Sequence, residues 1–345
     1  MTQLVQRLGR RGLPVIGAVA LALVVLGALI ALFGANPIAT ATALWRGVVG
    51  SPFTLGQTVM IASILALTAI AALLPFTAQL WNVGAEGQLY AGAIGSISAA
   101  LTLPVGAPGP VVMVISLIAG IAAGAVWGLV PGVLRTLFGA SEMIVSLLMN
   151  FLALLVANYI ITRVFPDSSG QSTRGVPSEA RLPVLWAAGN VTLGVIFAII
   201  VVLVVGIVLR STRFGFAVRA AGLNPRAARL AGFSDRSTSI ATFGLAGASA
   251  GLAGAMLVLG SSGHLSSGFS ANYGFIGVAV ALVAGLRPLF VIPSALLFGA
   301  LSVGSNSLQV AVGLPKDLGS VLVAVLVLVL LAVHVIRIRQ RGAAA

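Results

Sequence analysis

QTVMIASILALTAIAALLP, residues 57–75, carries no charged side chain over nineteen residues. An α-helix rises 1.5 Å per residue, so this stretch reaches about 28 Å, close to the ~30 Å hydrocarbon core of a membrane. We therefore predict a transmembrane helix here. The same argument predicts spans at 14–34, 86–103, 110–130, 142–162, 191–209, 237–260, 272–286, 289–311 and 318–336. The fold class that follows is all-α: a polytopic membrane protein of about ten transmembrane helices.

The composition supports a membrane protein over the whole length of 345 residues. Hydrophobic residues make up 59% of the chain and charged residues only 7%. Soluble domains carry about 25% charged residues, so this chain lacks the polar groups to cover a water-exposed surface. We expect residues 1–345 to form a single transmembrane domain.

The net charge of +13 is compatible with nucleic-acid binding, but the positions of the basic residues argue against it. They lie in the short gaps between apolar runs rather than along one face. With the N-terminus in the cytoplasm, fourteen of the nineteen basic residues fall in cytoplasmic segments and five outside. This bias follows the positive-inside rule and predicts that both termini are cytoplasmic.

Two loops are long enough to hold structure of their own. Residues 163–190 are predicted to be extracytoplasmic, and residues 210–236, the most basic stretch, to be cytoplasmic. Within the second, Asn224 is a good helix N-cap, Pro225 suits the first turn and Gly232 can close the helix. A helix of about two turns is expected, which could lie on anionic lipid headgroups or dock into a partner.

Few polar groups fall inside the predicted spans. Glu86 lies between Gly84 and Gly87, beside Asn82 and Gln88. A charged residue in a membrane helix costs about 2.5–3.5 kcal/mol on insertion scales. Two interpretations remain open: the segment is a helix break lining a substrate path, or Glu86 is a structural charge in a turn or at a helix start.

Two asparagines in other predicted spans raise a similar choice. Asn150 lies in run 142–162 and Asn306 in run 289–311. A buried Asn must find hydrogen-bond partners. Each could bond to a neighbouring helix or line a pore.

Four segments resemble those of ATP-binding-cassette import permeases, in the branch that serves nucleosides and simple sugars and is related to ribose and branched-chain amino-acid permeases. FTAQLWNVGAEGQL (76–89) is similar to the branch's asparagine–glycine–glutamate–glycine–glutamine signature. EMIVSLLMN (142–150) and YGFIGVAVAL (273–282) resemble two further segments of that branch, in the same order and at a similar spacing. AGLNPRAARLAGFS (221–234) resembles the cytoplasmic coupling loop, and the resemblance runs from about residue 10 to 335.

The resemblance implies roles for these residues and partners for the chain. It places Asn82, Glu86, Gln88, Asn150 and Asn306 along the substrate pathway of a permease in a bacterial plasma (inner) membrane. It also implies an ATPase subunit, a second, related but non-identical permease, and an extracytoplasmic solute-binding protein. The residues implied in ATPase coupling are Gly222, Asn224, Pro225, Ala228 and Gly232.

No enzymatic site is expected in this chain. A phosphate-binding P-loop needs Lys-Ser or Lys-Thr after spaced glycines, and the one lysine, Lys316, is followed by Asp317. The chain has no Cys and two distant histidines, so no metal or other cofactor is expected. ATP and Mg²⁺ would be bound by the partner ATPase.

The substrate expected from the resemblance is a nucleoside, because the 82–88 stretch is most similar to that branch. A monosaccharide such as ribose or galactose is the alternative. A secondary transporter would need membrane-embedded acids for ion coupling, and Glu86 alone qualifies.

Overall fold

The computed structural model describes residues 36–104 and 106–312, with isolated positions at 24, 27, 28, 30–32, 34, 321 and 325. The predicted spans 14–34 and 318–336 fall outside the described residues apart from those positions. The chain divides into two compact units, residues 59–297 and residues 1–58 with 298–345. Each unit is treated separately below.

The smaller unit contains α2 (Pro37–Val49), the first turns of α3 (Pro52–Thr77) and most of α12 (Pro288–Val312). Asn36 caps α2: its Oδ1 accepts hydrogen bonds from the backbone N–H groups of Ile38 and Ala39, at 2.9 and 3.3 Å. Asn306 is exposed on α12.

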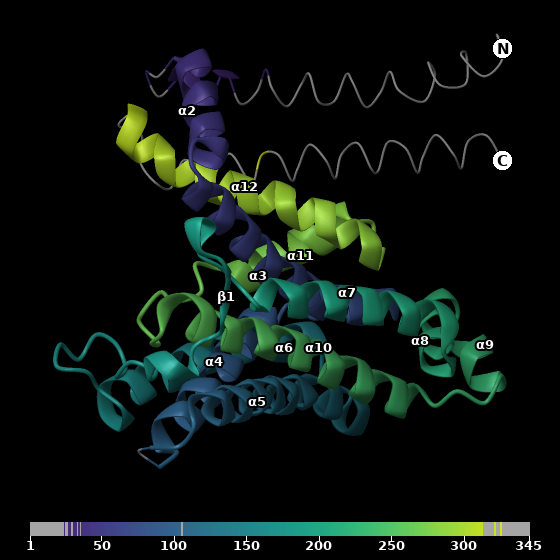
Figure 1. The fold of residues 1–345 in the computed structure, drawn as a ribbon. Coiled ribbons are helices and arrows are strands. Elements are labelled where there is room, and N and C mark those ends of the chain that lie inside the picture. The colour runs from purple at the N-terminus through teal and green to yellow at the C-terminus, as the bar shows by residue number, and fades with distance from the viewer. Residues whose placement is uncertain are drawn as a thin grey trace, which may run out of the picture. The chain divides into compact units, whose positions relative to one another are not determined.

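The larger unit is a bundle of helices with a small hairpin at one end (Figure 1). β1 and β2 pair antiparallel in that hairpin. The elements from α4 to α11, between the remainder of α3 and the start of α12, are α4 (Ala85–Thr102), α5 (Gly109–Phe138), α6 (Glu142–Tyr159) with the π-helix η1 (Ile160–Val164), the short 3₁₀ turns η2 (Ser178–Ala180) and η3 (Ala187–Gly189), β1 (Val184–Trp186), β2 (Val191–Thr192), α7 (Gly194–Ser211), α8 (Arg213–Leu223), α9 (Pro225–Leu230), α10 (Asp235–Leu257) with the π-helix η4 (Val258–Ser262), and α11 (Tyr273–Val283).

Six helices among the described residues are long and apolar enough to cross a membrane. They confirm the predicted spans at 57–75, 110–130, 142–162, 191–209, 237–260 and 289–311. The chain is therefore a polytopic helical membrane protein. α4 also coincides with the predicted span at 86–103.

The prediction of a membrane span at 272–286 is wrong in its length. α11 has 11 residues, which at 1.5 Å each reach about 16 Å, roughly half the hydrocarbon core. Hydrophobicity alone cannot distinguish a full helix from a half-helix that follows a loop.

Small residues bring α4, α5 and α10 into backbone contact. A Cβ atom added to Gly124 of α5 would meet the carbonyl oxygen of Gly247 and the Cα atom of Gly251, both on α10. One added to Gly92 of α4 would also meet Gly251. Residues 246–255 of α10 thus include a helix-packing face. In lipid, where hydrophobicity does not drive helices together, such close packing and its van der Waals contacts do.

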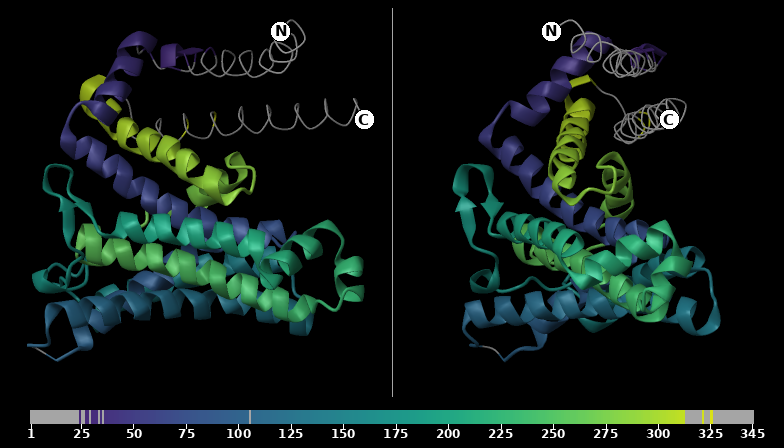
Figure 2. Two further views of the ribbon diagram at one scale, coloured as in Figure 1. Left: turned by 45° about the vertical axis from the view of Figure 1, so that its right-hand side comes forward. Right: turned by 90° about the vertical axis from the view of Figure 1, so that its right-hand side faces the viewer.

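The hairpin and the short helices lie at opposite ends of the larger unit. Figures 1 and 2 show α7 running from β1 and β2 at one end to α8 and α9 at the other. The two-turn helix expected near Asn224 is confirmed as α9, whereas α8, of 11 residues, was not predicted.

At the hairpin end, residues 173–182 lie alongside residues 259–265, and backbone hydrogen bonds hold the two segments together. The N–H groups of Thr173, Val176 and Leu182 donate to the carbonyls of Leu265, Gly263 and Leu259, at 2.8, 2.7 and 2.9 Å. In the same loop, hydrogen bonds from the Ser172 and Ser169 hydroxyls lower the pKa of Asp167 to about 2. That carboxylate therefore stays ionised at neutral and mildly acidic pH, and its hydrogen bonds support the turn there.

We expect Gly124→Leu to destabilise the bundle. Its side chain has no room against Gly247 and Gly251, and overpacking of this kind costs about 1–3 kcal/mol or more. Ala122→Leu is the matched control, because Ala122 is exposed on the same helix. Thermal unfolding in detergent should show a midpoint several degrees lower for Gly124→Leu alone. Equal midpoints for the two variants would contradict the close contact.

Candidate functional site

The segment between α3 and α4 is held inside the protein by a pair of amide side chains. Asn82 Nδ2 donates to Gln88 Oε1 at 3.2 Å, and Gln88 Nε2 donates back to Asn82 Oδ1 at 3.3 Å. Asn82 also donates to the Ala71 carbonyl at 3.0 Å and accepts from the Gly84 N–H at 3.0 Å. Both side chains are buried and their hydrogen-bonding capacity is largely used within the segment.

Side chains of α6 also hold this segment through hydrogen bonds to its backbone. Asn150 Oδ1 accepts from the Gly87 N–H at 2.8 Å, and Asn150 Nδ2 donates to the Val83 carbonyl at 2.9 Å. The Ser146 hydroxyl, one turn earlier, accepts from the Val83 N–H at 3.2 Å. Asn150 therefore substitutes for the helical partners that the broken backbone lacks.

The segment lies at membrane depth. Eight residues of α6 separate Glu142, at its first turn, from Asn150, which corresponds to about 12 Å along the axis. On α3, Thr68 is nine residues before the last residue, Thr77, or about 13 Å. The Thr68 hydroxyl donates to the Tyr273 carbonyl at 3.1 Å, which places the start of α11 at this same depth.

Glu86 joins the starts of two helices there. It lies in the first turn of α4, is 3% exposed, and its Oε2 accepts a hydrogen bond from the Gly274 N–H at 2.7 Å. Gly274 is in the first turn of α11 and lies so close that a Cβ atom would meet the backbone of Glu86. The carboxylate thus satisfies an otherwise unpaired N–H and faces the positive ends of two helix dipoles.

Unusual backbone conformations border this junction. Gln79, Ala271 and Asn272 have φ angles of 59°, 46° and 63°. Residues other than glycine rarely adopt this left-handed region, which costs free energy and tends to occur at functional sites. The strain lies in the loops that lead into the two helix starts.

Tyr90, one turn after Glu86 on α4, contacts the loop that leads into α11. Its hydroxyl accepts from the Ser270 N–H at 3.4 Å, and its ring lies 6.2 Å from that of Phe269, centre to centre. The loop before α11 is thereby fixed to α4 at two points, Glu86 and Tyr90.

We name this arrangement the helix-start junction: Asn82, Glu86, Gln88, Asn150 and Gly274. Four of the five predicted pathway residues meet in it, and the fifth, Asn306, belongs to the smaller unit. Ser146 and Gly274 were missed. Both lie within stretches that carry the resemblance, and Ser146 is four residues before Asn150, on the same helix face.

The predicted coupling residues form the cap and the closure of α9. Asn224 Oδ1 accepts from the N–H groups of Arg226 and Ala227, both at 3.1 Å, and Pro225 is the first residue of the helix. Ala228 is buried, and Gly232 follows the helix with φ of 85°. Gly222, at the end of α8, packs directly on the carbonyl of Thr77, the last residue of α3. The short helices thus contact α3 immediately before the buried segment.

α8 and α9 also present apolar side chains to solvent. Leu223 is 89% exposed and Leu230 is 90% exposed. Ala228 is buried, and the rings of Phe216 and Phe233 contact each other in a tilted arrangement, with centres 5.4 Å apart. Both leucines are therefore available for contact with a partner protein or with lipid headgroups.

The described residues contain no group of three or more His, Cys, Asp or Glu side chains that could hold a metal ion.

Comparison with known proteins relates these features to transport. The family model described as "Branched-chain amino acid transport system / permease component" matches residues 54–331. The guanosine ABC transporter permease protein NupP of Bacillus subtilis is 32% identical over 99% of this chain and 100% of its own length. The nucleoside ABC transporter permease protein NupB of Lactococcus lactis is 33% identical over 88% of this chain and 86% of its own. A glucose ABC transporter permease protein of Haloferax volcanii is 31% identical over 93% and 87%.

We expect Asn150→Ala to lower stability, because it leaves the Gly87 N–H and the Val83 carbonyl unpaired. Each unsatisfied buried group costs about 1–3 kcal/mol. Asn158→Ala is the control, because Asn158 is exposed on the same helix. Thermal unfolding should separate the two variants by several degrees. A wild-type midpoint for Asn150→Ala would show that the buried segment does not depend on this side chain.

Proposed function

The chain belongs to the family of permease components of branched-chain amino acid transport systems, and on that premise we propose that it imports a nucleoside by alternating access, driven by a separate ATPase. As a member, it is a multi-pass permease subunit of an ATP-binding-cassette importer in the bacterial plasma membrane, without a catalytic role of its own. The observation that carries the proposal is the helix-start junction, where a half-helix begins at membrane depth on a buried carboxylate. Discontinuous helices whose ends meet near mid-membrane are typical of substrate sites in transporters.

We propose ten spans with both termini in the cytoplasm. The distribution of the nineteen basic residues supports this orientation. It assigns residues 210–236, with α8 and α9, to the cytoplasm, and residues 163–190, with β1 and β2, to the outer side. In this orientation α11 runs from mid-membrane towards the cytoplasm.

α9 is the proposed contact with the ATPase. Two features support it: the exposed Leu223 and Leu230, and the direct contact of Gly222 with Thr77. Movement of α8 and α9 on ATP binding would shift the end of α3. The Ala71 carbonyl of α3 holds Asn82, so the shift would reach the helix-start junction.

The substrate pathway is proposed to pass the helix-start junction, and Asn306 of the smaller unit is proposed separately as a pathway residue. In the described conformation Asn82, Gln88 and Asn150 bond to the protein itself, so their role is to shape the wall of the pathway. Glu86 differs, because a carboxylate can exchange the Gly274 N–H for a hydroxyl or amino group of a passing solute. That exchange would release the start of α11 and couple solute passage to helix movement.

A nucleoside is the proposed substrate because two relatives that match most of this chain are named for guanosine and nucleoside transport. A monosaccharide is the second candidate, which the similarity to a glucose permease favours.

Complete function would require an ATPase that binds ATP and Mg²⁺, a solute-binding protein and a second, non-identical permease. A binding screen of that solute-binding protein against guanosine, adenosine, ribose and glucose tests the choice. Micromolar binding of a nucleoside alone is expected, and binding of a sugar alone would contradict it.

We expect Glu86→Gln to reduce nucleoside uptake about tenfold while the protein still inserts and folds. The glutamine oxygen still accepts from the Gly274 N–H, but the charge that faces two helix dipoles is lost. Glu179→Gln, a change to an exposed acid in the 163–190 loop, is the control. Uptake at the wild-type rate with normal expression would mean that Glu86 is a structural cap and no more.

Leu230→Glu should abolish association with the ATPase without unfolding the permease, because the leucine side chain is exposed. The measurement is co-purification of the ATPase with the membrane-embedded permease. Leu185→Glu, on β1 at the opposite end, should leave co-purification unchanged. Loss of the ATPase in both variants, or in neither, would argue against α9 as the contact.

A further inference from the structure

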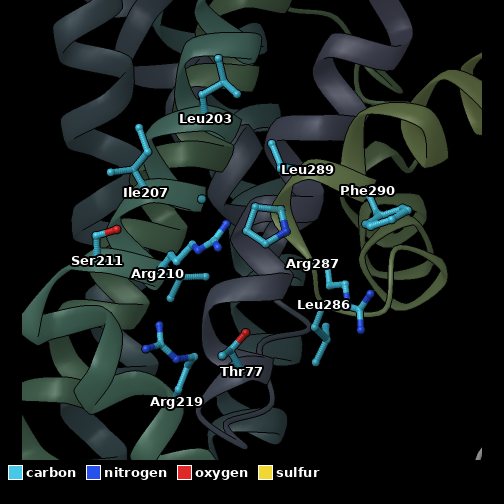
Figure 3. Close-up of a pocket in the computed structure, with 13 residues that line it drawn as sticks. Thr77, Leu203, Ile207, Arg210, Ser211, Arg219, Leu286, Arg287, Leu289 and Phe290 are labelled. Carbon is cyan, nitrogen blue, oxygen red and sulfur yellow. The ribbon is translucent and has the colours of Figure 1, made fainter.

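A cavity of about 510 Å³ opens where α7 meets α8, and three arginines line it. They come from three elements: Arg210 from the end of α7, Arg219 from α8, and Arg287 from the turn before α12. Figure 3 shows Arg210 extending towards the middle of the lining residues, with Arg219 below it and Arg287 across from it. The remaining lining residues include apolar side chains such as Leu203, Ile207 and Leu289.

The positive charge of this cavity is not balanced by its walls. No Asp or Glu lines it, and the one ion pair among the described residues joins Arg135 to Glu142, neither of which lines it. Arg287 instead lies 5.9 Å from the ring centre of Phe290. Arginine side chains are long and suit phosphate geometry, so three guanidinium groups around one cavity favour a phosphate group as ligand.

A second cavity lies along α7 and α12 beside the first, since Val202 lines it and the next residue, Leu203, lines the basic cavity; we call the two cavities together the cleft. It has a volume of about 280 Å³ and is lined by residues such as Val195, Ile199 and Val202 on α7 and Ile292 and Leu296 on α12. Its one polar side chain, Ser63, already donates to the Met60 carbonyl at 2.7 Å. The cleft is therefore basic at one end and apolar along its length.

The length of the cleft fits one membrane leaflet. Fifteen residues of α7 separate Val195 from Arg210, which corresponds to about 22 Å. Half of a bilayer with its headgroups is about 20–22 Å. A phosphate at the arginines and an acyl chain against the apolar cavity would occupy both cavities at once.

We propose that this cleft binds one anionic phospholipid of the cytoplasmic leaflet. The leaflet assignment rests on the orientation proposed above; the site itself rests on the two cavities. Basic pockets between membrane helices at the cytoplasmic surface are suited to anionic headgroups. A free phosphate or nucleotide would use the arginines but leave the apolar cavity empty.

The site has a consequence for transport. Thr77 lines the basic cavity, and Arg219 belongs to α8, which packs on Thr77 through Gly222. A bound phosphate therefore links the ends of α3 and α7 to α8 and the turn before α12. It would stabilise the base on which α9 rests and strengthen coupling in membranes rich in anionic lipid.

The test measures lipid binding to the purified full chain by native mass spectrometry, with phosphatidylglycerol and phosphatidylcholine of identical acyl chains. The variants are Arg210→Gln/Arg287→Gln and Ile199→Trp, which fills the apolar cavity. The charge-matched control is Arg213→Gln/Arg236→Gln, whose residues do not line the cleft. Unfolding midpoints without added lipid check that each variant is folded.

The wild type and the control should bind phosphatidylglycerol at least tenfold more tightly than phosphatidylcholine, and both cleft variants should lose most of that preference. Equal binding by control and cleft variants would overturn the proposal. A second outcome would also overturn it: the arginine variant loses the preference, Ile199→Trp keeps it, and inorganic phosphate displaces the bound lipid. That result would show that the arginines bind a soluble anion instead of a phospholipid. Detergent-purified protein exposes both faces, so an error in orientation would leave this result unchanged.

Discussion

Backbone contact between α4, α5 and α10 is the constraint on which the larger unit depends. Glycines at the crossing points, Gly92, Gly124 and Gly251, remove the side chains that would otherwise hold the three helices apart. Because lipid offers apolar side chains as good an environment as the protein interior does, only such close approach makes association favourable. It fixes α4 on one face and leaves its start free to meet α6 and α11 on the other. The helix-start junction is thus held at membrane depth by a rigid support.

Polar groups at that depth must be bonded within the protein, and this requirement decides which residues occur there. A helix that begins inside the membrane leaves N–H groups without partners. Glu86 supplies an acceptor for α11, and Asn150 supplies one for the start of α4. The same residues that make the break tolerable also give it a charge that a solute could contact. Of the two interpretations of Glu86 considered from sequence, the structure shows a charge at a helix start, and the role in a substrate path stays a prediction.

Sequence predicted the features that depend on local chemistry. Apolar length identified the long spans, and Asn224, Pro225 and Gly232 marked both ends of α9. It could not predict the partner of Glu86, because Gly274 lies 188 residues away and no local pattern links them. The end of α11 at Val283 was missed because the residues that follow it, Ala284-Gly285-Leu286, are as uncharged as the helix itself. α8 was missed because its basic residues and glycines resemble those of a loop. The missed partner of Glu86 is a tertiary contact, whereas α8 and the end of α11 were missed because local composition does not mark them.

The central claim is that α9 and the outer loops lie on opposite sides of the membrane, with the helix-start junction between them. The chain contains no cysteine, so single cysteines introduced in place of Arg229 and Ser267 can be labelled without background. The direct measurement is reaction with a membrane-impermeant maleimide in right-side-out and inverted vesicles. The structure and the charge distribution predict that the cysteine at 267 reacts only in right-side-out vesicles and the one at 229 only in inverted ones. Labelling of both from the same side would contradict the claim.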